Sequence, residues 1–339
     1  MRFVVFSSLF LLLAACSRQA PPVPAPEWSV DEQLLYYGIP VRVLFSPANE
    51  QLEKEVWRYL HKIDDRYNDW RDDSEIGRLN VATVGQPLPL DREFADVWKL
   101  CLQAHAATDG AFDPTIRPLR QLWRDAEKSA APPSPTAVAE AVARGGIDKL
   151  TIDDKGVATR HDAGVSLDLG GVIKGFAVDH VANQLRTANC SAALVQIGGE
   201  TVVWGTSKRG KPHAIAIQHP TNLDEYWTVL EDPGSGFSCA TSGNYRNPVK
   251  IGDQTYYHVI DPRTGQPVDT DVLSVTILFP QPGRNGLADA LSTAGAVLGP
   301  EATLRIAAEF GAEALVLIRD GEEIKEIASP GFAKFKRPL

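Results

Sequence analysis

The stretch Ser166-Leu167-Asp168-Leu169-Gly170-Gly171-Val172-Ile173-Lys174-Gly175-Phe176-Ala177 organises the chain. The apolar run from Val165 to Leu169 predicts a short strand that breaks at the glycine pair, and the following residues have the spacing of a helix with one apolar face. Glycines let the backbone approach a ligand, the helix start offers free N–H groups, and Lys174 adds a positive charge, so the stretch suits an anion. A plain strand-to-helix turn capped by Asp168 explains the pattern equally well.

The length and charge of the chain limit its class. Its 339 residues are enough for one large domain or two closely packed ones. The formal net charge is −9, which argues against nucleic acid as a partner. A phosphorylated ligand would need local positive charge, and a divalent cation would help. Cys101, Cys190 and Cys239 lack the spacing of zinc ligands; at most one pair could form a disulfide, and Cys101 fits a helix core.

The first 27 residues have the composition of an export and anchoring segment. Residues 1–15 predict a signal peptide with a short apolar region, and Leu13-Ala14-Ala15-Cys16 resembles a bacterial lipobox, in which the cysteine becomes lipidated. Residues 16–27, with the lipidated Cys16, form a proline-rich tether, and residues 28–339 a single folded domain. An ordinary secretory signal is the alternative. We expect an exported protein that is lipid-anchored to a bacterial membrane and faces the periplasm or the outer surface.

Periodicity predicts a mixture of strands and helices along the folded part. Strands are expected near 36–45, 192–197, 201–205, 213–217, 226–230, 255–260 and 272–279, with a hairpin near 313–328. Helices are expected at about 47–65, from Asp91 onward, just before Gly145-Gly146, and at 286–298 and 300–310. Residues 68–76 and 111–116 are interpreted as loops. Strands at irregular spacing with helices on one side indicate an α+β fold.

A few polar residues are candidates for chemistry. Asp289 and Thr293 lie four apart in a predicted helix and so point to one side, and a carboxylate with a hydroxyl suits Mg²⁺. An acid near the helix start and a back-bonding threonine explain the same pair structurally. His258 in a strand is either a structural residue or a general base. Trp70, in a charged loop, either anchors that loop or offers a stacking surface.

Six motifs, in this order, together resemble the ApbE family of FAD:protein FMN transferases, over about residues 35 to 320. They are Asp73-Ser74-Glu75-Ile76-Gly77-Arg78-Leu79-Asn80, Gly110-Ala111-Phe112-Asp113-Pro114-Thr115, Asp168-Leu169-Gly170-Gly171-Val172-Ile173-Lys174-Gly175, Gln196-Ile197-Gly198-Gly199-Glu200, His258-Val259-Ile260-Asp261-Pro262-Arg263-Thr264-Gly265 and Ala288-Asp289-Ala290-Leu291-Ser292-Thr293-Ala294.

The resemblance implies an activity, a fold and partners. The family moves FMN from FAD onto a Thr or Ser hydroxyl of an acceptor protein, through a phosphoester bond, and releases AMP in a Mg²⁺-dependent reaction. Acceptors are often subunits of membrane redox pumps. The implied fold is a two-lobed, T-fold-like arrangement of mainly antiparallel sheets with flanking helices, with FAD between the lobes. Two alternatives stay open: an FAD pyrophosphatase that yields FMN and AMP, and a non-catalytic flavin-binding lipoprotein.

The resemblance also implies roles for single residues. The metal would be held by Gly171, through its carbonyl, together with Asp289 and Thr293, and His258 resembles the catalytic histidine of the family. Residues that would contact the flavin nucleotide are Tyr37, Trp70, Ala111, Phe112, Asp113, Asp168, Lys174 and His258. Two positions depart from the family pattern: Trp70 stands where many members have Tyr, and Tyr37 where many have Met.

Overall fold

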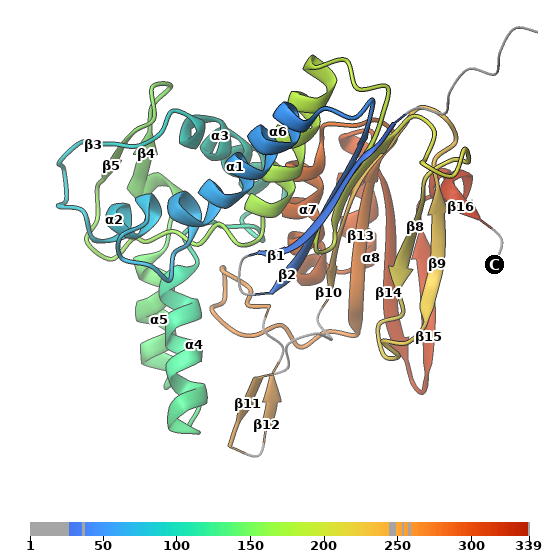
Figure 1. Ribbon diagram of the computed structural model, residues 1–339. Helices are drawn as coiled ribbons and strands as arrows, with labels where there is room; N and C mark the ends of the chain where they lie inside the picture. Colours follow the sequence, from blue (N-terminus) through green and yellow to red (C-terminus); the bar gives the residue numbers. More distant parts are fainter. Residues whose placement is uncertain (1–26, 36–37, 244–248, 253, 257–258, 338–339) are drawn as a thin grey trace, which may run out of the picture.

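A computed structural model describes residues 27–337 apart from 36–37, 244–248, 253 and 257–258. Within these residues, eight antiparallel strands form the main sheet, in which β13 lies near the middle (Figure 1). In spatial order the strands are β1 (Ser29–Leu35), β2 (Ile39–Ser46), β6 (Ala192–Ile197), β7 (Glu200–Trp204), β10 (Phe237–Gly243), β13 (Val272–Phe279), β14 (Glu313–Asp320) and β15 (Glu323–Ala328).

Helices and three smaller sheets complete the described chain. The helices are α1 (Glu50–Tyr67), α2 (Glu75–Val81), α3 (Glu93–Ala107), α4 (Arg117–Ser129), α5 (Pro135–Arg144), α6 (Ile173–Thr187), α7 (Asn285–Leu298) and α8 (Pro300–Glu309), with 3₁₀ turns η1 (Ile147–Lys149) and η3 (Pro330–Phe335). The smaller sheets are β3 (Leu88–Pro89) with β5 (Val157–Arg160) and β4 (Leu150–Ile152), β16 (Lys336–Arg337) with β9 (Tyr226–Glu231) and β8 (Ala214–Gln218), and β11 (Val249–Ile251) with β12 (Gln254–Tyr256).

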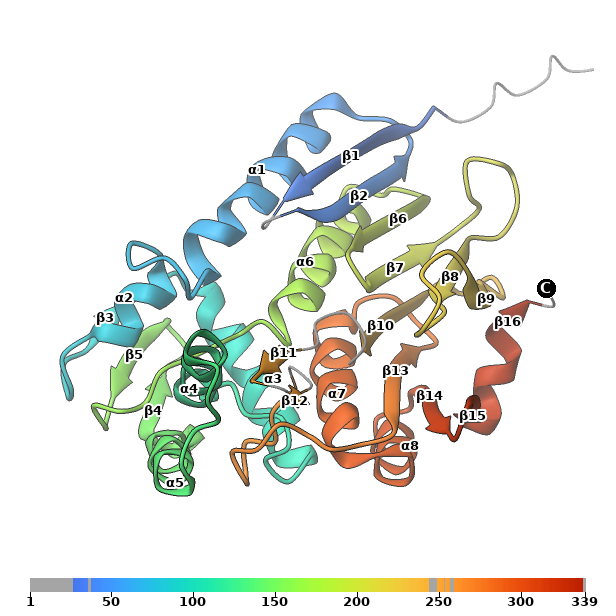
Figure 2. The same cartoon turned by 90° about the horizontal axis from the view of Figure 1, so that it is seen from below.

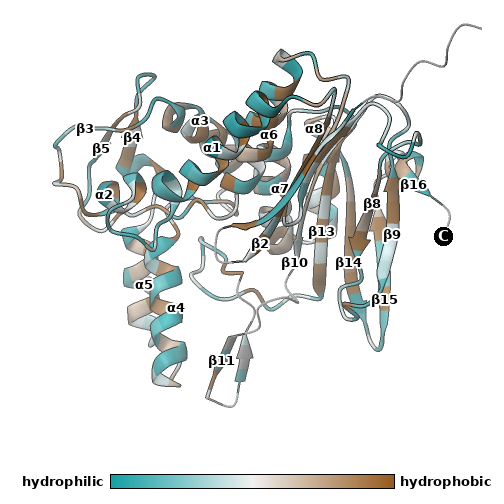
Figure 3. Cartoon of the chain, in the orientation of Figure 1, coloured by the Kyte–Doolittle hydropathy of each residue, from teal (hydrophilic) through white to brown (hydrophobic). Residues whose placement is uncertain are grey.

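Both faces of the main sheet are covered, which explains why all eight residues of β13 are buried. Successive side chains of a strand point to opposite faces, and in β13 they join two different cores. Ile277 belongs to the core under α6 and α7, whereas Leu278 belongs to the core under β8, β9 and η3. Figure 3 shows the apolar residues concentrated in these central strands. The sheet is therefore the middle layer of the larger lobe.

A second, mostly helical lobe contains α1 to α5 and the sheet of β3, β4 and β5, and Figure 2 shows it beside the sheet lobe. The α4–α5 pair projects from this lobe on the same side as the β11–β12 hairpin (Figure 1). The expected α+β fold, two-lobed with mainly antiparallel sheets and flanking helices, is confirmed. The expected bounds of a signal peptide at 1–15, a tether at 16–27 and one domain at 28–339 stay predictions, and Cys16 lies outside the described residues.

The predicted strand at Val165 to Leu169 is wrong, because its backbone groups bond to a side chain and a loop. Leu167 N–H donates to Asn80 Oδ1 at 2.7 Å, and Leu167 C=O accepts from Asn80 Nδ2 at 3.0 Å. Asp168 N–H donates to the carbonyl of Pro114 at 2.8 Å. The segment is largely buried, as its apolar pattern indicated, yet no strand among the described residues pairs with it.

Several helical boundaries also differ from those expected. Helix α1 begins at Glu50 and not near residue 47, because Asn49 caps it by accepting from Leu52 N–H at 3.0 Å. Neither α2 nor α4 was expected, and the first residues of α2 fall within the expected loop 68–76. The described helices include none long and apolar enough to cross a bilayer. Cys101, Cys190 and Cys239 are buried and free, so the one possible disulfide among them does not form and Cys101 belongs to the core.

Candidate active site

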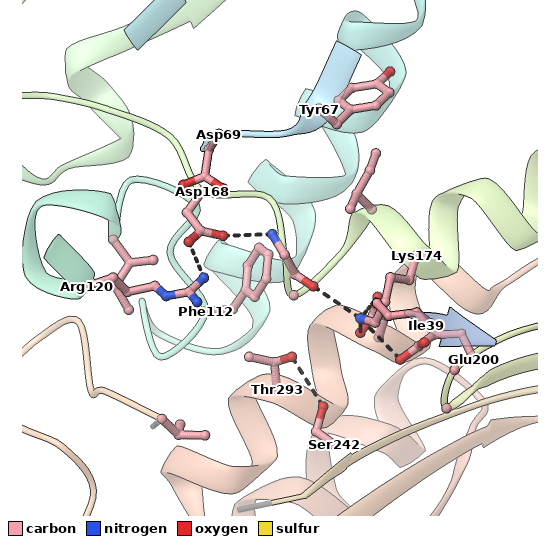
Figure 4. A pocket seen from close by; sticks show the side chains of 18 of the residues that line it. Ile39, Tyr67, Asp69, Phe112, Arg120, Asp168, Lys174, Glu200, Ser242 and Thr293 are labelled. Atoms are coloured by element: carbon pink, nitrogen blue, oxygen red, sulfur yellow. Dashed lines mark hydrogen bonds and ion pairs between the residues drawn. The ribbon is translucent and has the colours of Figure 1, made fainter. Parts of the chain in front are cut away.

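A cavity of about 820 Å³ lies where the two lobes meet. Its wall is built from the loop 68–70, the segment 111–116, the glycine corner 168–174, the turn 198–200, the end of β10 and the buried side of α7. Figure 4 shows side chains from these segments pointing toward one another. Five of the six sequence motifs therefore meet at this cavity or border it, although they are spread over more than half of the chain.

The glycine corner is a tight turn that leads directly into α6. Asp168 Oδ1 accepts from Gly170 N–H at 2.8 Å, and α6 begins at Ile173 without a side-chain cap. Two of the first N–H groups of this helix already have acceptors: Ile173 N–H donates to the carbonyl of Leu169 at 2.9 Å and Gly175 N–H to Asp289 Oδ2 at 3.1 Å. Asp168 itself is an ion-pair partner of Arg120, which reaches it from α4. The contact of Asp168 with a ligand stays a prediction. Its carboxylate already forms an ion pair with Arg120.

Lys174 lies between two buried carboxylates. Its Nζ is 3.3 Å from Asp289 Oδ2 and 3.3 Å from Glu200 Oε1, and it donates to the Gly170 carbonyl at 3.1 Å (Figure 4). Asp289 and Glu200 are only 1% and 2% exposed. Burial lowers the pKa of Lys174, but the charges of Asp289 and Glu200 outweigh it and raise that pKa above its usual value, so the ammonium is retained.

Glu200 has the opposite balance. Burial raises the pKa of its carboxyl group, against the pull of Lys174, and the charge of Asp289 raises it further. Its Oε2 atom is buried and has no hydrogen-bond partner in the described part of the chain. The sequence motif that ends in Glu200 gave it no role, and nothing in the local sequence marks it as buried beside Lys174.

The three predicted metal ligands meet in one wall of the cavity. A Cβ atom placed on Gly171 would lie 3.1 Å from Thr293 Oγ1, so this glycine and α7 are in direct contact. Asp289, one helical turn before Thr293, accepts from Gly175 N–H at 3.1 Å. The Thr293 hydroxyl lies 3.3 Å from Ser242 Oγ (Figure 4). Asp289 therefore does not face solvent, and the metal-binding role of the three residues stays a prediction beside the structural one.

The donor chemistry of this wall fits a hard divalent cation. Asp289 supplies a carboxylate, Thr293 a hydroxyl and Gly171 a backbone carbonyl, and Mg²⁺ is commonly held by one or two carboxylates with further neutral oxygens and water. Among the described residues there is no cluster of three or more His, Cys, Asp or Glu side chains that could hold a metal. The wall of Asp289, Thr293 and Gly171 itself offers oxygen donors, which suit a hard cation.

The segment Ala111-Phe112-Asp113 lines the cavity opposite α7. Phe112 is buried, its N–H donates to Thr108 Oγ1 at 3.1 Å, and its ring lies 3.4 Å from the Cβ position of Gly171. Asp113 Oδ1 accepts from both the N–H and the hydroxyl of Thr115, at 2.7 and 2.6 Å. These contacts fix the segment and leave its apolar surface toward the cavity.

Trp70 lines the entrance of the cavity and is 56% exposed, so it does not anchor its loop in the core. The guanidinium of Arg124, from α4, lies 3.3 Å from the centre of the indole ring, a cation–π contact. Asp69, next to Trp70, accepts a hydrogen bond at Oδ2 from Arg117 Nε at 3.3 Å. Burial, together with the charge of Asp168, raises the pKa of Asp69 to about 6. The exposed ring agrees with the stacking-surface interpretation.

Some site residues fall outside the described part, and others were missed. Tyr37 and His258 lie outside the described residues, so their predicted roles are not tested. Arg120 and Arg124 were missed because α4 was not expected as a helix. The apolar spacing Leu119, Trp123 and Ala126 carried that signal, and these three side chains are the buried face of α4.

The protein is thus of the antiparallel α+β class, and oxygen donors and a lysine line one cavity between its lobes. The ApbE family model matches residues 36–316, and the chain belongs to the ApbE family. The family expected from the six motifs is thus confirmed.

Curated relatives agree with this assignment. "FAD:protein FMN transferase" of Klebsiella pneumoniae is 31% identical, with 96% of this chain and 94% of the relative covered, and that of Vibrio cholerae is 31% identical with 98% of each covered. The solved structure "Flavin Transferase ApbE from Vibrio cholerae" has a TM-score of 0.78 at 29% identity and covers 91% of this chain and 99% of that one. The expectation that the chain is an enzyme of the transferase class is confirmed by these relatives.

Proposed function

We propose that the protein transfers FMN from FAD to a Thr or Ser hydroxyl of an acceptor protein, forms a phosphoester bond and releases AMP, with Mg²⁺ required. The observation that carries the proposal is the meeting of Gly171, Asp289 and Thr293 in one cavity wall beside Lys174. The names of the curated relatives support the same reaction.

The charges around the cavity suit the pyrophosphate of FAD. The whole chain has a formal net charge of −9 and would repel a dinucleotide, so binding needs local positive charge. Lys174, which lies between the carboxylates of Asp289 and Glu200, supplies one positive charge there. Asp289, Thr293 and the Gly171 carbonyl would hold Mg²⁺, which would neutralise the pyrophosphate and stabilise the leaving AMP.

The remaining residues bind and orient the substrate. Gly170 and Gly171 carry no side chain, so the backbone can approach a phosphate or a cation closely. Phe112 offers an apolar surface, and Trp70 offers an exposed ring on which a planar ring of the nucleotide can stack. The proton of the attacking hydroxyl would pass either to His258, which resembles the family's catalytic histidine, or to a nearby carboxylate.

The location of the enzyme is part of the proposal. A signal peptide at 1–15 and a lipidated Cys16 would tether the catalytic domain outside the cytoplasm, at a bacterial membrane. A tethered enzyme can reach a membrane redox pump subunit that carries a Thr or Ser acceptor site. Replacing Cys16 with Ser should abolish the incorporation of a labelled fatty acid into the chain; equal labelling of the variant and the unaltered chain would contradict the anchor.

Mass analysis of the acceptor tests the reaction. The purified chain is incubated with FAD, Mg²⁺ and a redox pump subunit, and the intact mass of that subunit is measured. A gain equal to one FMN residue supports transfer. Free FMN and AMP with an unmodified subunit would show hydrolysis, and intact FAD would show a flavin-binding protein without catalysis.

A further inference from the structure

The ammonium of Lys174 pairs with the same Asp289 carboxylate that would bind a cation. Its ammonium lies 3.3 Å from Oδ2 and 3.4 Å from Oδ1 of Asp289, and Asp289 also accepts from Gly175 N–H. A divalent cation bound to the same carboxylate would lie close to that ammonium, and like charges at such distances repel strongly where water is scarce. Cation binding therefore requires Lys174 to give up some of its contact with Asp289.

Glu200 offers Lys174 a second partner. Its Oε1 is 3.3 Å from Nζ, on the side of β7, while its buried Oε2 has no hydrogen-bond partner among the described residues (Figure 4). Glu200 can thus accept a further N–H from the ammonium without losing an existing bond. A buried polar atom without a partner is costly, so this second contact is favourable when it forms.

The turn that carries Glu200 is held firmly. Ile197 pairs with Glu200 across a two-glycine turn, and Gly198 has the positive φ of 61° that favours glycine. At Gly199 a Cβ atom would lie 2.8 Å from the carbonyl oxygen of Thr241, so the turn packs directly against β10. Glu200 is therefore a fixed acceptor toward which the flexible Lys174 side chain can move.

We propose that Glu200 is a positioning residue that takes over Lys174 when Asp289 binds a divalent cation. The inference rests on the proposed function, because that function supplies the cation. Through Glu200, Lys174 stays beside the cation with its charge directed at the cavity, where a phosphate group meets both. Without Glu200, Asp289 is the remaining carboxylate for Lys174, and the ammonium competes with the cation for it.

In a simpler model, the negative charge of Glu200 attracts the cation directly and Lys174 has no part. A double-mutant cycle distinguishes this model from the one proposed here. Binding of Mn²⁺, as a probe of the Mg²⁺ site, is measured by electron paramagnetic resonance of the free ion, with and without FAD. The variants are Glu200→Gln, Lys174→Met and the double variant. Glu231→Gln, which removes one half-buried charge from β9 that pairs with Arg337, is the control.

We expect Glu200→Gln to raise the Kd for Mn²⁺ by roughly 10-fold, the scale of outer-shell changes at metal sites. In the Lys174→Met background the same change should have no further effect, since the competing ammonium is gone. Glu231→Gln should bind Mn²⁺ as the unaltered chain does. Circular dichroism of each variant verifies folding.

Two results would overturn the inference alone. One is an unchanged Kd for Mn²⁺ in Glu200→Gln, and the other is an equal loss of Mn²⁺ affinity on this change in the unaltered and the Lys174→Met backgrounds. A different result would overturn the proposed function as well, namely no Mn²⁺ binding by the unaltered chain with or without FAD. The failure of the inference and the failure of the function are therefore distinguishable in one experiment.

Discussion

The N–H of Gly175 donates to the carboxylate of Asp289 at 3.1 Å, which ties α6 to α7 at the floor of the cavity. The two helices approach closely here: a Cβ atom on Gly175 would lie 2.2 Å from the carbonyl oxygen of Asn285 and 2.9 Å from Cβ of Asp289. Only glycine fits at this crossing. The glycine-rich corner therefore positions the proposed cation ligand as well as the start of α6.

Gly175→Ala tests this crossing. The added methyl group meets backbone that has no room to move, so we expect the free energy of unfolding to fall by ~3 kcal/mol, at the upper end of usual overpacking effects. Cation affinity should fall too, because α7 shifts away from the corner. Chemical denaturation and Mn²⁺ binding measure both. Asn183→Ala, at an exposed position of α6, is the control; a stable Gly175→Ala variant with unaltered Mn²⁺ affinity would refute the argument.

Trp70 provides a test of ring stacking. Replacing it with Ala removes the exposed ring and should weaken FAD binding by about 1–3 kcal/mol, the usual contribution of one stacked base. Trp70→Tyr keeps an aromatic face and should retain most of the affinity. Titration followed by flavin fluorescence gives the Kd. Tyr226→Ala removes an equally exposed aromatic ring from β9 and should leave the Kd unchanged; an equal loss in both variants would argue against stacking at Trp70.

Asp179 caps the start of α7 from α6. Its two carboxylate oxygens accept from Asn285 and Gly286 N–H groups, each at 2.8 Å. Asp179→Ala leaves both donors without their partner and should lower the free energy of unfolding by about 1–3 kcal/mol, whereas Asp179→Asn keeps one acceptor and should cost less. Urea denaturation compares them, with Lys128→Ala on the exposed face of α4 as the control. Equal stability of all variants would exclude a capping role.

The same residue predicts a pH dependence. Burial raises the pKa of Asp179 from 3.8 to about 6, against the two N–H groups, so the folded chain binds this proton more tightly than the unfolded chain. The stability gained from this tighter proton binding is fully present below pH 3.8. It is lost as the pH rises through about 6. In Asp179→Asn this part of the pH dependence should vanish; an identical profile in the variant and the unaltered chain would contradict the assignment.

Part of the site could be predicted from the sequence because spacing within a single helix or turn determines where those residues lie. Asp289 and Thr293 stand four apart in a helix, and that spacing alone places both on one side. The glycine pair before Lys174 likewise indicated a corner at the start of a helix, and α6 begins within two residues of it.

Other parts depend on contacts across the chain. The run from Val165 to Leu169 has the composition of a strand, but the side chain of Asn80, 87 residues away from Leu167, bonds its backbone, and no strand in the described part of the chain pairs with it. The contact of Lys174 with Glu200 and Asp289 joins three separate motifs, and no periodicity records it. The helix α4 was missed although Leu119, Trp123 and Ala126 have the spacing of one buried helix face.

The most direct measurement is AMP release from FAD in the presence of Mg²⁺ and the acceptor subunit, compared between the unaltered chain and Asp289→Ala. The account predicts one AMP released for each FMN attached to the acceptor, a requirement for Mg²⁺, and loss of both products in Asp289→Ala. Equal AMP release by the two chains, or release that does not depend on Mg²⁺, would contradict the claim that this carboxylate holds the cation at which FAD is cleaved.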